Sequence, residues 1–247
     1  MISNKLKNKL KDIYFKEQFN PRYIGVFINP FYFARKNLYK NRAKLSGNLK
    51  GKLLDIGCGN KPYEHLFKVD SYLGIEIYTA KNRKNKADLF YDGRNFPFPD
   101  ETFDSILATE VFEHVFNPDE FLKEVNRIMK KGGKLLITVL FVWEEHEQPY
   151  DYARYTYFGL QYILEKNGFK IIDHIRSCDG FEVIFQLINV YIFKKTITSS
   201  KFLNLWFIVM FTAPINIVGL GLSKILPRNK DLYLDNIILA EKTRDVE

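Results

Sequence analysis

The sequence predicts an α/β fold in which crossover helices join the strands of a parallel sheet. Short β-type runs alternate with helical patterns from Lys52 to Ile175, as βαβ units require. A glycine-rich turn at residues 57–59 directly follows the first of these runs. A long apolar stretch, the 60 residues from Arg176 to Asp235, then indicates an insertion in the sheet framework.

Composition and charge narrow the class of protein. The 247 residues are 46% hydrophobic and 27% charged, which fits a globular chain and excludes disordered and collagen-like classes. The two cysteines, Cys58 and Cys178, are too few for a disulfide scaffold, so a reducing compartment fits. The formal charge of +8 is uneven, because residues 1–52 carry 13 Lys/Arg and 2 Asp/Glu. This imbalance argues against a nucleic-acid partner and indicates a basic arm or face.

Residues 1–50 are expected to form a basic helical arm. No apolar core of a secretory signal occurs in residues 1–19. Within them, apolar residues recur at helical spacing between lysines and predict an amphipathic helix; they are Leu6, Leu10, Ile13 and Tyr14. Residues 33–45 predict a second basic helix. Two interpretations of the first helix remain open: it packs one stripe on the domain, or it rests on anionic lipid head groups.

Residues 51–176 are expected to form the core domain. The candidate strands are 53–56, 72–76, 87–91, 104–108, 134–141 and 169–175. Between them, one helix begins with Asn117 as N-cap and Pro118 as its first residue, and Gly132 ends it. A second helix begins after the N-cap Thr156 and ends at Gly168.

The segment LLDIGCGN, residues 53–60, carries the strongest functional signal. Gly57 and Gly59 allow a sharp bend and a close approach of the backbone to a ligand. In open α/β sheets, ligands bind beyond the carboxyl ends of the strands. Glu76 ends the next candidate strand, where a carboxylate can accept hydrogen bonds from both hydroxyls of a ribose. Pro62 occupies the third glycine position of a dinucleotide motif, so a nucleoside cofactor without a diphosphate fits better.

Together these motifs resemble those of class I S-adenosylmethionine (SAM)-dependent methyltransferases, over about residues 50–176. The resemblance implies a Rossmann-like, doubly wound sheet of seven strands, mostly parallel with the seventh antiparallel, and SAM as cofactor. It also implies that Asp55 lies near the methionine part, that Glu76 binds the ribose, and that Asp92 lies near the adenine amino group. The cofactor-binding residues expected from it are Asp55, Gly57, Cys58, Gly59, Asn60, Glu76, Ile77, Asp92, Gly93 and Thr109.

Each of these residues also has a purely structural interpretation. Asp55 can cap the turn that follows it, Glu76 can be a solvated strand end, and Asp92–Gly93 can be a simple turn. Cys58 fits a small packing residue better than a nucleophile. Their occurrence together, in order and at strand ends, favours the cofactor site.

Two clusters are candidates for the proton acceptor that an alcohol nucleophile requires. The first is Glu110, Glu113 and His114, which would share one face of a helix. Its E-x-x-E-H pattern resembles that of ubiquinone-pathway O-methyltransferases, where it has been linked to a divalent cation. The alternative is that these residues only order the loop under the cofactor. We expect no metal, and the chain has no metal-type cysteine pair.

The second cluster runs from His146 to Thr156, after the fifth strand. We expect His146 to act as general base, and Asp151 or Arg154 to orient the substrate or hold the loop. A structural salt bridge between Asp151 and Arg154 is the alternative. The predicted catalytic residues are therefore His146, Asp151 and His114. The string resembles bacterial methyltransferases associated with polysaccharide and glycolipid synthesis.

The insertion, residues 177–235, precedes a seventh strand expected at 236–241, which opens the tail 236–247. Residues 181–193 are apolar except for a narrow polar stripe of Glu182, Gln186 and Asn189, and residues 202–223 carry no charge in 22 positions. A single membrane crossing would separate the seventh strand from its sheet. We therefore expect a monotopic hairpin, bent near Pro214, in one leaflet with basic flanks at the head groups. The alternative is a buried helical pair that forms a substrate lid or a dimer interface.

These expectations combine into one functional prediction. The chain transfers a methyl group from SAM to an acceptor hydroxyl or amine, on a small-molecule or lipid-linked glycan precursor. It is placed in the cytoplasm of a bacterium, peripheral or monotopic at the inner membrane face, without a nucleic-acid partner and with its oligomeric state open. Two alternatives remain: a soluble O-methyltransferase of quinones or phenols, and a non-catalytic binding module with a methyltransferase-like fold.

Overall fold

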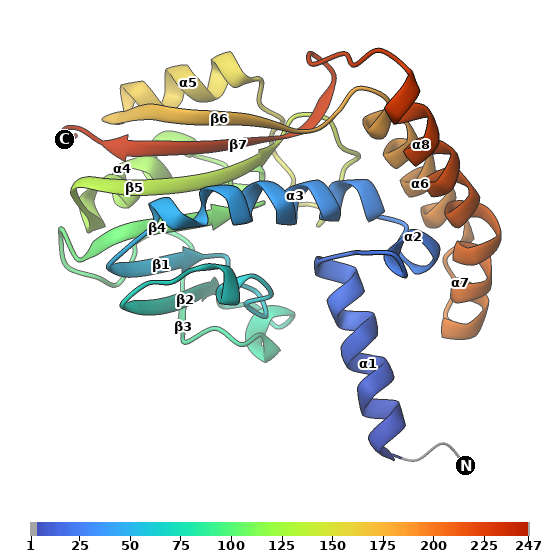
Figure 1. The fold of residues 1–247 in the computed structure, drawn as a ribbon. Helices are drawn as coiled ribbons and strands as arrows, with labels where there is room; N and C mark the ends of the chain where they lie inside the picture. The colour runs from blue at the N-terminus through green and yellow to red at the C-terminus, as the bar shows by residue number, and fades with distance from the viewer. Residues whose placement is uncertain (1–3, 247) are drawn as a thin grey trace. The chain divides into compact units, whose positions relative to one another are not determined.

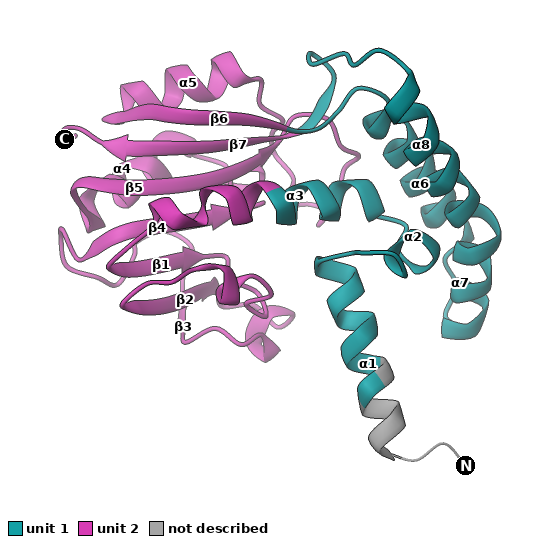
Figure 2. Ribbon diagram, in the orientation of Figure 1, with its two compact units in different colours: residues 1–40, 177–234 teal, residues 41–176, 235–247 magenta. Residues whose placement is uncertain are grey.

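The computed structural model describes residues 4–246, which divide into two compact units. Unit 1 comprises residues 1–40 and 177–234, and unit 2 comprises residues 41–176 and 235–247 (Figure 2). Residues 1–40 of the N-terminal arm and nearly all of the insertion thus belong to the same unit. This association is not evident from the sequence, in which the two segments lie more than 130 residues apart.

A seven-stranded sheet in the order β3-β2-β1-β4-β5-β7-β6 forms the framework of unit 2 (Figure 1). β7 runs antiparallel to β5, whereas the pairings among β1 to β5 are parallel. The predicted fold class is confirmed. The strands are β1 Lys52–Ile56, β2 Ser71–Ile77, β3 Leu89–Tyr91, β4 Phe103–Thr109, β5 Met129–Leu140, β6 Phe169–Asp179 and β7 Tyr233–Lys242.

The central strands are apolar because both of their faces are covered. Leu53, Leu54 and Ile56 of β1 are fully buried, as expected for a strand between two parallel neighbours. The first eight residues of β7 are all buried, since this strand lies between β5 and β6. The register brings Asp55 opposite Gly74 on one side and Leu107 on the other. The chemistry-bearing end of β1 therefore lies next to the ends of β2 and β4.

Two helices of unit 2, α4 (Pro118–Ile128) and α5 (Tyr157–Lys166), pack on the same apolar cluster as the strands. α5 begins as predicted, because the Thr156 hydroxyl accepts a hydrogen bond from the Gly159 N–H at 3.1 Å. Short 3₁₀ turns occur at 46–48 (η1), 64–66 (η2), 82–84 (η3) and 112–114 (η4).

The predicted end of α4 at Gly132 is wrong. The helix ends at Ile128, and Met129 is already extended and paired with Phe103. Lys130 forms an ion pair with Asp104 of the neighbouring strand at 2.7 Å instead of facing the helix end. The sheet ladder therefore outweighs the local helix-end signal of the two lysines.

Unit 1 is helical. It contains α1 (Asn4–Phe19), α2 (Gly25–Ile28), the first part of α3 (Tyr32–Leu45), α6 (Phe181–Thr196), α7 (Lys201–Phe207) and α8 (Ala213–Ile225). A π-helical turn, η5 (Ile208–Thr212), joins α7 to α8 directly before Pro214. Of the predicted stripe on α1, the side chains of Leu6 and Leu10 lie outside the described residues, and Tyr14 is exposed.

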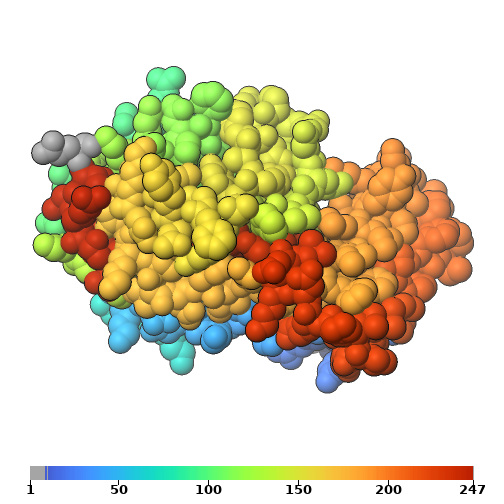
Figure 3. Space-filling view, turned by 90° about the horizontal axis from the view of Figure 1, so that it is seen from above, coloured from blue at the N-terminus to red at the C-terminus, as the bar shows by residue number. Residues whose placement is uncertain are grey.

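The insertion is a helical hairpin, as expected, but the predicted bend near Pro214 is wrong, because residues 201–225 form one continuous helix. Residues 197–200 reverse the chain, and α6 then packs against α8 (Figure 1). Asn189 of α6 donates to Asn216 of α8 at 2.8 Å, and a Cβ at Gly219 would lie 2.8 Å from the Phe185 ring. These pairs run in opposite order along the two helices, so the hairpin is antiparallel. Its surface is coloured from orange to red in Figure 3.

The N-cap of α5 supplies a test of the local fold. Thr156→Ala removes the acceptor of the Gly159 N–H, and we expect the free energy of unfolding to fall by about 1 kcal/mol. Urea denaturation followed by circular dichroism measures this change. Thr156→Asn keeps a capping oxygen and should retain most of the stability. Equal losses in both variants would contradict the capping role.

Candidate cofactor site and active site

The turn after β1 requires glycine. Gly57 and Gly59 have positive φ angles of 69° and 52°, and a Cβ on Gly57 would lie 2.4 Å from a methyl group of Val111. The N–H groups of Gly57 and Cys58 both donate to the carbonyl of Ile75, at 2.9 and 3.2 Å. These bonds hold the turn against the end of β2. A Cβ on Gly59 would meet nothing within 4 Å, so this side of the turn is open to a ligand.

Glu76 lies at the end of β2 and its carboxylate faces this turn. One oxygen accepts from Gly59 N–H at 3.0 Å. The Asn82 and Asn85 side-chain amides add longer bonds of 3.3 Å from the following loop. Glu76 is 9% exposed, and its carboxylate accepts hydrogen bonds only from uncharged N–H groups. A buried carboxylate of this kind is ready to accept further hydrogen bonds from hydroxyl groups.

Asp55 is almost fully buried within β1, and two residues that sequence reasoning missed surround it. The Tyr72 hydroxyl donates to its carboxylate, and the Arg42 charge acts on it from α3. Burial raises the pKa of Asp55 to about 7, although Tyr72 and Arg42 both favour the ionised form. The Tyr72 contact follows from register, because Gly74 lies opposite Asp55 and Tyr72 is two residues before it on the same face. Arg42 carries no comparable signal in the sequence.

Cys58 is a packing residue in this structure. Its sulfur occupies the space above Gly74, where a Cβ would lie 2.7 Å away. Burial raises the pKa of the thiol to about 12, so the side chain stays protonated. Lys61 pairs with Asp88 beside it, and Asp88 also accepts from the Gly74 N–H at 2.7 Å. This network fixes the loop that continues from the exposed Asn60.

The remaining predicted cofactor residues lie at the ends of β2, β3 and β4. Asp92 is exposed and accepts from the N–H groups of Arg94 and Asn95, at 2.9 and 3.3 Å, so it does form the simple turn considered as an alternative. Gly93, with φ of 85°, and the half-exposed Ile77 lie beside each other in this region. The structure therefore brings the predicted set together along one edge of the sheet.

Thr109 ends β4 on the same edge. Its hydroxyl is buried and has no hydrogen-bond partner among residues 4–246. Buried hydroxyls are normally satisfied, so an unpartnered one at this edge marks a position where a ligand can supply the missing bond.

The second cluster forms around Asp151. Arg154 binds its carboxylate in a bidentate manner, with bonds of 2.6 and 2.7 Å, so the salt bridge considered as the alternative is present. The same carboxylate accepts from the His146 N–H at 2.8 Å and lies 3.2 Å from His146 Nδ1. Arginine holds the pKa of Asp151 well below its usual range. Asp151 therefore both anchors the loop and orients the imidazole of His146.

The electrostatics around His146 favour the neutral imidazole. Burial lowers its pKa below the ordinary value, and this effect exceeds the opposing attraction of Asp151. His146 Nδ1 lies 3.2 Å from the Asp151 carboxylate and 3.5 Å from Arg154 Nη2, so the closer acceptor favours a proton on Nδ1 and leaves Nε2 as the acceptor. The ring of His114 lies 4.8 Å away, and its own Nδ1 is 2.6 Å from the Tyr150 carbonyl.

The first cluster is not helical, contrary to the expected shared helix face. Glu110 adopts a left-handed conformation with φ of 52°, which is incompatible with an α-helix, and a short 3₁₀ turn follows at 112–114. Glu110 accepts from the Thr138 hydroxyl at 2.9 Å and points to β5. Glu113 is fully buried, and both carboxylate oxygens lack a hydrogen-bond partner in the described part of the chain. Burial, reinforced by Glu110, raises its pKa.

Glu113, His114 and His146 nevertheless converge. Their ligand atoms lie within 4.8 Å of one another, so the pair of histidines from two loops and the buried carboxyl group form one polar centre. One carboxylate and two imidazoles are also a donor set that divalent transition metals accept. The expected absence of a metal stays a prediction.

The comparison with known proteins decides the family. A family model described as a methyltransferase domain matches residues 31–174. The chain belongs to this methyltransferase family. Membership identifies S-adenosyl-L-methionine as the cofactor of the domain, in agreement with the glycine turn and the strand-end acids.

Individual relatives of this methyltransferase domain are partial matches. An uncharacterised protein of Methanocaldococcus jannaschii is 34% identical over 146 residues, covering 53% of this chain and 61% of its own length. A fatty-acid O-methyltransferase of Mycolicibacterium smegmatis is 31% identical over 114 residues, covering 41% of each chain. The chain spans between 41% and 61% of the length of the first such relatives.

Solved structures share the fold. Phosphoethanolamine N-methyltransferase 2 of Haemonchus contortus, in complex with S-adenosyl-L-methionine, superposes with a TM-score of 0.55 at 19% identity. The match covers 93% of this chain and 59% of that one. Identity this low supports the architecture alone.

The buried Asp55 gives a pH-dependent prediction. Its folded-state pKa of about 7 lies above the ordinary value of 3.8, so ionising it costs stability progressively as the pH rises between these values. We expect Asp55→Asn to be more stable than the parent by on the order of 2–4 kcal/mol at about pH 8, measured by urea unfolding. The difference should nearly vanish at about pH 4. A difference independent of pH would contradict the buried titration.

Proposed function

We propose that this chain is a SAM-dependent methyltransferase that uses His146 as general base toward an acceptor hydroxyl. The proposal is carried by one juxtaposition: the glycine turn after β1 and the Asp151-oriented His146 both follow strands that end at the same edge of the sheet. A cofactor held at the turn and an acceptor held at His146 would therefore meet at that edge. An amine acceptor remains the alternative.

The residues of the turn fit the cofactor. When bound, SAM supplies an electrophilic methyl group on a sulfonium. Glu76 would accept hydrogen bonds from the ribose hydroxyls in place of the two long bonds from asparagines. The open side of Gly59 leaves room for the cofactor to approach the backbone of the turn. Asp55 would lie near the methionine part and Asp92 near the adenine amino group. Thr109 offers the unpartnered hydroxyl at the end of β4.

His146 has the properties that a general base needs. Its neutral form is favoured by burial, and Asp151 fixes the tautomer so that Nε2 accepts the proton of the attacking hydroxyl. Arg154 neutralises Asp151 and keeps it in place. His114, with its Nδ1 held by the Tyr150 carbonyl, presents a second imidazole that can receive or relay the proton.

We further propose that unit 1 attaches the enzyme to a membrane. The support is that polar side chains are buried inside this unit while large apolar side chains are exposed, the reverse of the usual distribution in a soluble protein. The inner face of the 201–225 helix carries Ile208, Thr212, Asn216 and Gly219, two of which are polar and buried. Its outer face carries large exposed apolar side chains: Phe202, Leu203, Leu205, Trp206, Val209, Met210, Phe211, Ile217, Val218, Leu222 and Ile225. Contiguous exposed apolar surface of this kind marks a site of attachment.

The buried polar stripe of α6 supports the same arrangement. Gln186 accepts from the Ala34 N–H at 3.1 Å and donates to the Pro30 carbonyl at 2.9 Å. Asn216 donates to the carbonyls of Val26 and Asn29. These bonds use the polar groups inside unit 1, so that its outside is left apolar. A soluble hairpin would show the opposite distribution.

The orientation follows from charge. The 25-residue helix Lys201–Ile225 has a mean hydropathy of 2.0 and is only 28% buried, so its length and composition suit a membrane span. Basic residues lie at both ends of the hairpin, with Lys195 and Lys201 near its tip and Lys224 and Arg228 near its base. Both ends would then stay in the head-group layer, and the hairpin would lie along one leaflet.

A membrane surface supports a lipid-linked or lipidic acceptor, including the lipid-linked glycan precursor predicted from the sequence. One relative in the family is named as a fatty-acid O-methyltransferase, which supports an amphiphilic acceptor. We place the protein at the cytoplasmic face of the inner membrane.

Methyl transfer tests the catalytic proposal. With labelled SAM and a membrane lipid extract as acceptor, His146→Ala should lower turnover by about 10²–10⁴-fold but keep the affinity for S-adenosylhomocysteine, measured by calorimetry. Glu76→Ala should instead abolish S-adenosylhomocysteine binding, whereas Glu64→Gln on an exposed turn should change neither quantity. A wild-type protein that binds neither SAM nor S-adenosylhomocysteine would refute the function.

Vesicle sedimentation tests the membrane proposal. Phe202→Glu combined with Trp206→Glu places two charges on the outer face of α7, and we expect vesicle binding to fall at least tenfold because burying each charge in the apolar layer is costly. Phe158→Glu combined with Tyr162→Glu, which places two charges on the exposed face of α5, is the matched control. Affinity for S-adenosylhomocysteine should be unchanged in both variants. Unaltered vesicle binding by the α7 variant would overturn this attachment.

A further inference from the structure

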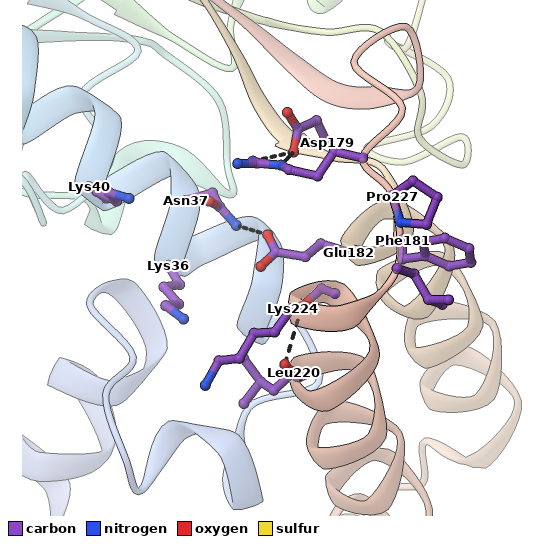
Figure 4. A pocket seen from close by; sticks show the side chains of 12 residues that line it. Lys36, Asn37, Lys40, Asp179, Phe181, Glu182, Leu220, Lys224 and Pro227 are labelled. Atoms are coloured by element: carbon purple, nitrogen blue, oxygen red, sulfur yellow. Dashed lines mark hydrogen bonds and ion pairs between the residues drawn. The ribbon is translucent and has the colours of Figure 1, made fainter.

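Unit 1 contains a cavity of about 240 Å³ between the beginning of α6, the end of α8 and the first part of α3 (Figure 4). Its lining is strongly charged. Four cations, Lys36, Lys40, Lys224 and Arg228, face two carboxylates, so the formal charge of the lining is +2. Neither the glycine turn nor the His146 centre contributes a residue to it.

Both carboxylates of the cavity already have partners. Arg228 binds Asp179 through its Nη2 at 2.5 Å and its Nε at 3.1 Å. Glu182 accepts from the Asn37 side-chain amide at 2.7 Å. These contacts are drawn as dashed lines in Figure 4. These contacts pair one of the four cations with a carboxylate. Of the three lysines, Lys36 lies over the Tyr32 ring, 5.2 Å from its centroid, a contact that leaves its charge in place.

The three lysines are not neutralised by the protein. No carboxylate lies within 4.0 Å of the ammonium groups of Lys36, Lys40 or Lys224 among residues 4–246. Lys36 and Lys40 are one turn apart on α3, where like charges repel, and Lys224 faces the same cavity from the last turn of α8 (Figure 4). A bound anion would relieve this repulsion and satisfy several N–H donors at once.

We propose that this cavity binds the phosphate group of a lipid or lipid-linked molecule. Lysines are point charges that bind phosphate through several N–H donors, and the cavity has room for a phosphate with a small ester substituent. Besides the polar Asn37 and Ser223, the uncharged part of the lining is apolar, from Phe181, Leu220, Leu226 and Pro227. Leu220 belongs to the same helix as the exposed Leu222 and Ile225, so acyl chains attached to the phosphate would continue onto the apolar outer face.

That the bound phosphate belongs to a lipid rests on the proposed membrane attachment of unit 1. That the cavity binds a phosphate group does not depend on this attachment. Free phosphate esters present the same group without acyl chains. The test therefore needs one arm with vesicles and one arm in solution.

The vesicle arm compares the full-length protein with the triple variant Lys36→Gln, Lys40→Gln, Lys224→Gln. Phosphatidylcholine vesicles are doped with phosphatidic acid or, at equal charge, with oleate. We expect the wild type to prefer phosphatidic acid over oleate by roughly tenfold and the triple variant to lose this preference, because at equal surface charge only phosphatidic acid offers a phosphate group that several lysine N–H donors can bind together. A matched triple variant of exposed lysines in unit 2, Lys44→Gln, Lys50→Gln and Lys170→Gln, should keep the preference.

The solution arm measures binding of sn-glycerol 3-phosphate by calorimetry, without vesicles. Binding by the wild type and its loss in the triple variant support the phosphate site even if no vesicle binds, which would contradict only the membrane attachment. Equal binding to phosphatidic acid and oleate vesicles, together with no heat from glycerol phosphate, would overturn the proposal. Equal thermal unfolding and equal S-adenosylhomocysteine affinity in all variants exclude misfolding. If the Lys→Gln triple variant does not fold, the Lys→Arg triple variant keeps the charge and should still bind glycerol phosphate.

Discussion

The position of β7 constrains the whole C-terminal half of the chain. β7 pairs with β5 over seven residue pairs and lies between β5 and β6, so the chain that leaves β6 must return to its starting point. The Gly180 N–H donates to the Leu232 carbonyl at 2.8 Å and closes the intervening segment. Because both ends are fixed in this way, the insertion must double back. A single crossing of a bilayer is excluded by this closure, whatever the hydropathy of the 201–225 helix.

The polar stripe of α6 then decides which side of the hairpin is outside. Buried amides normally find partners: Gln186 bonds to Pro30 and Ala34 through both of its polar atoms, and the Asn189 nitrogen donates to Asn216 of α8. Once these groups are used internally, the opposite faces of α7 and α8 present mainly apolar side chains, with Lys201 and Lys224 exposed at the two ends. The stripe is visible in the sequence. Whether it faces the inside or the outside of unit 1 is not, since the partners Pro30 and Ala34 lie about 150 residues earlier in the chain.

Most of the sheet could be predicted because each strand has a local signature. The seven predicted strands all occur, with β1, β2 and β4 extended by one or two residues. The errors fall where a distant partner overrides a local signal. The lysines after α4 indicate a helix end near Gly132, but pairing with Phe103 converts residues 129–132 into strand. Glu110 likewise leaves helical conformation where its backbone and side chain both engage Thr138.

The site shows the same division between local and distant information. Asp55 and Glu76 are identified by a turn and a strand end, which are local features. Tyr72 is recoverable from strand register, whereas Arg42 reaches Asp55 from a helix whose position no pattern in the sequence predicts.

Buried acceptor oxygens without partners distinguish the binding edge from the supporting loop, where the Arg154 Nε is the buried side-chain atom that lacks a partner among the described residues. Asp151 has its oxygens filled by Arg154 and His146, which is the state of a group that holds structure. Glu113 and Thr109, at or after the end of β4, are buried without hydrogen-bond partners among the described residues. Natural folds tolerate such costs chiefly where function requires them. The edge of the sheet that follows β1 and β4 is therefore the part of unit 2 whose side chains are incomplete without a ligand, and the His146 loop is the part already built to position one.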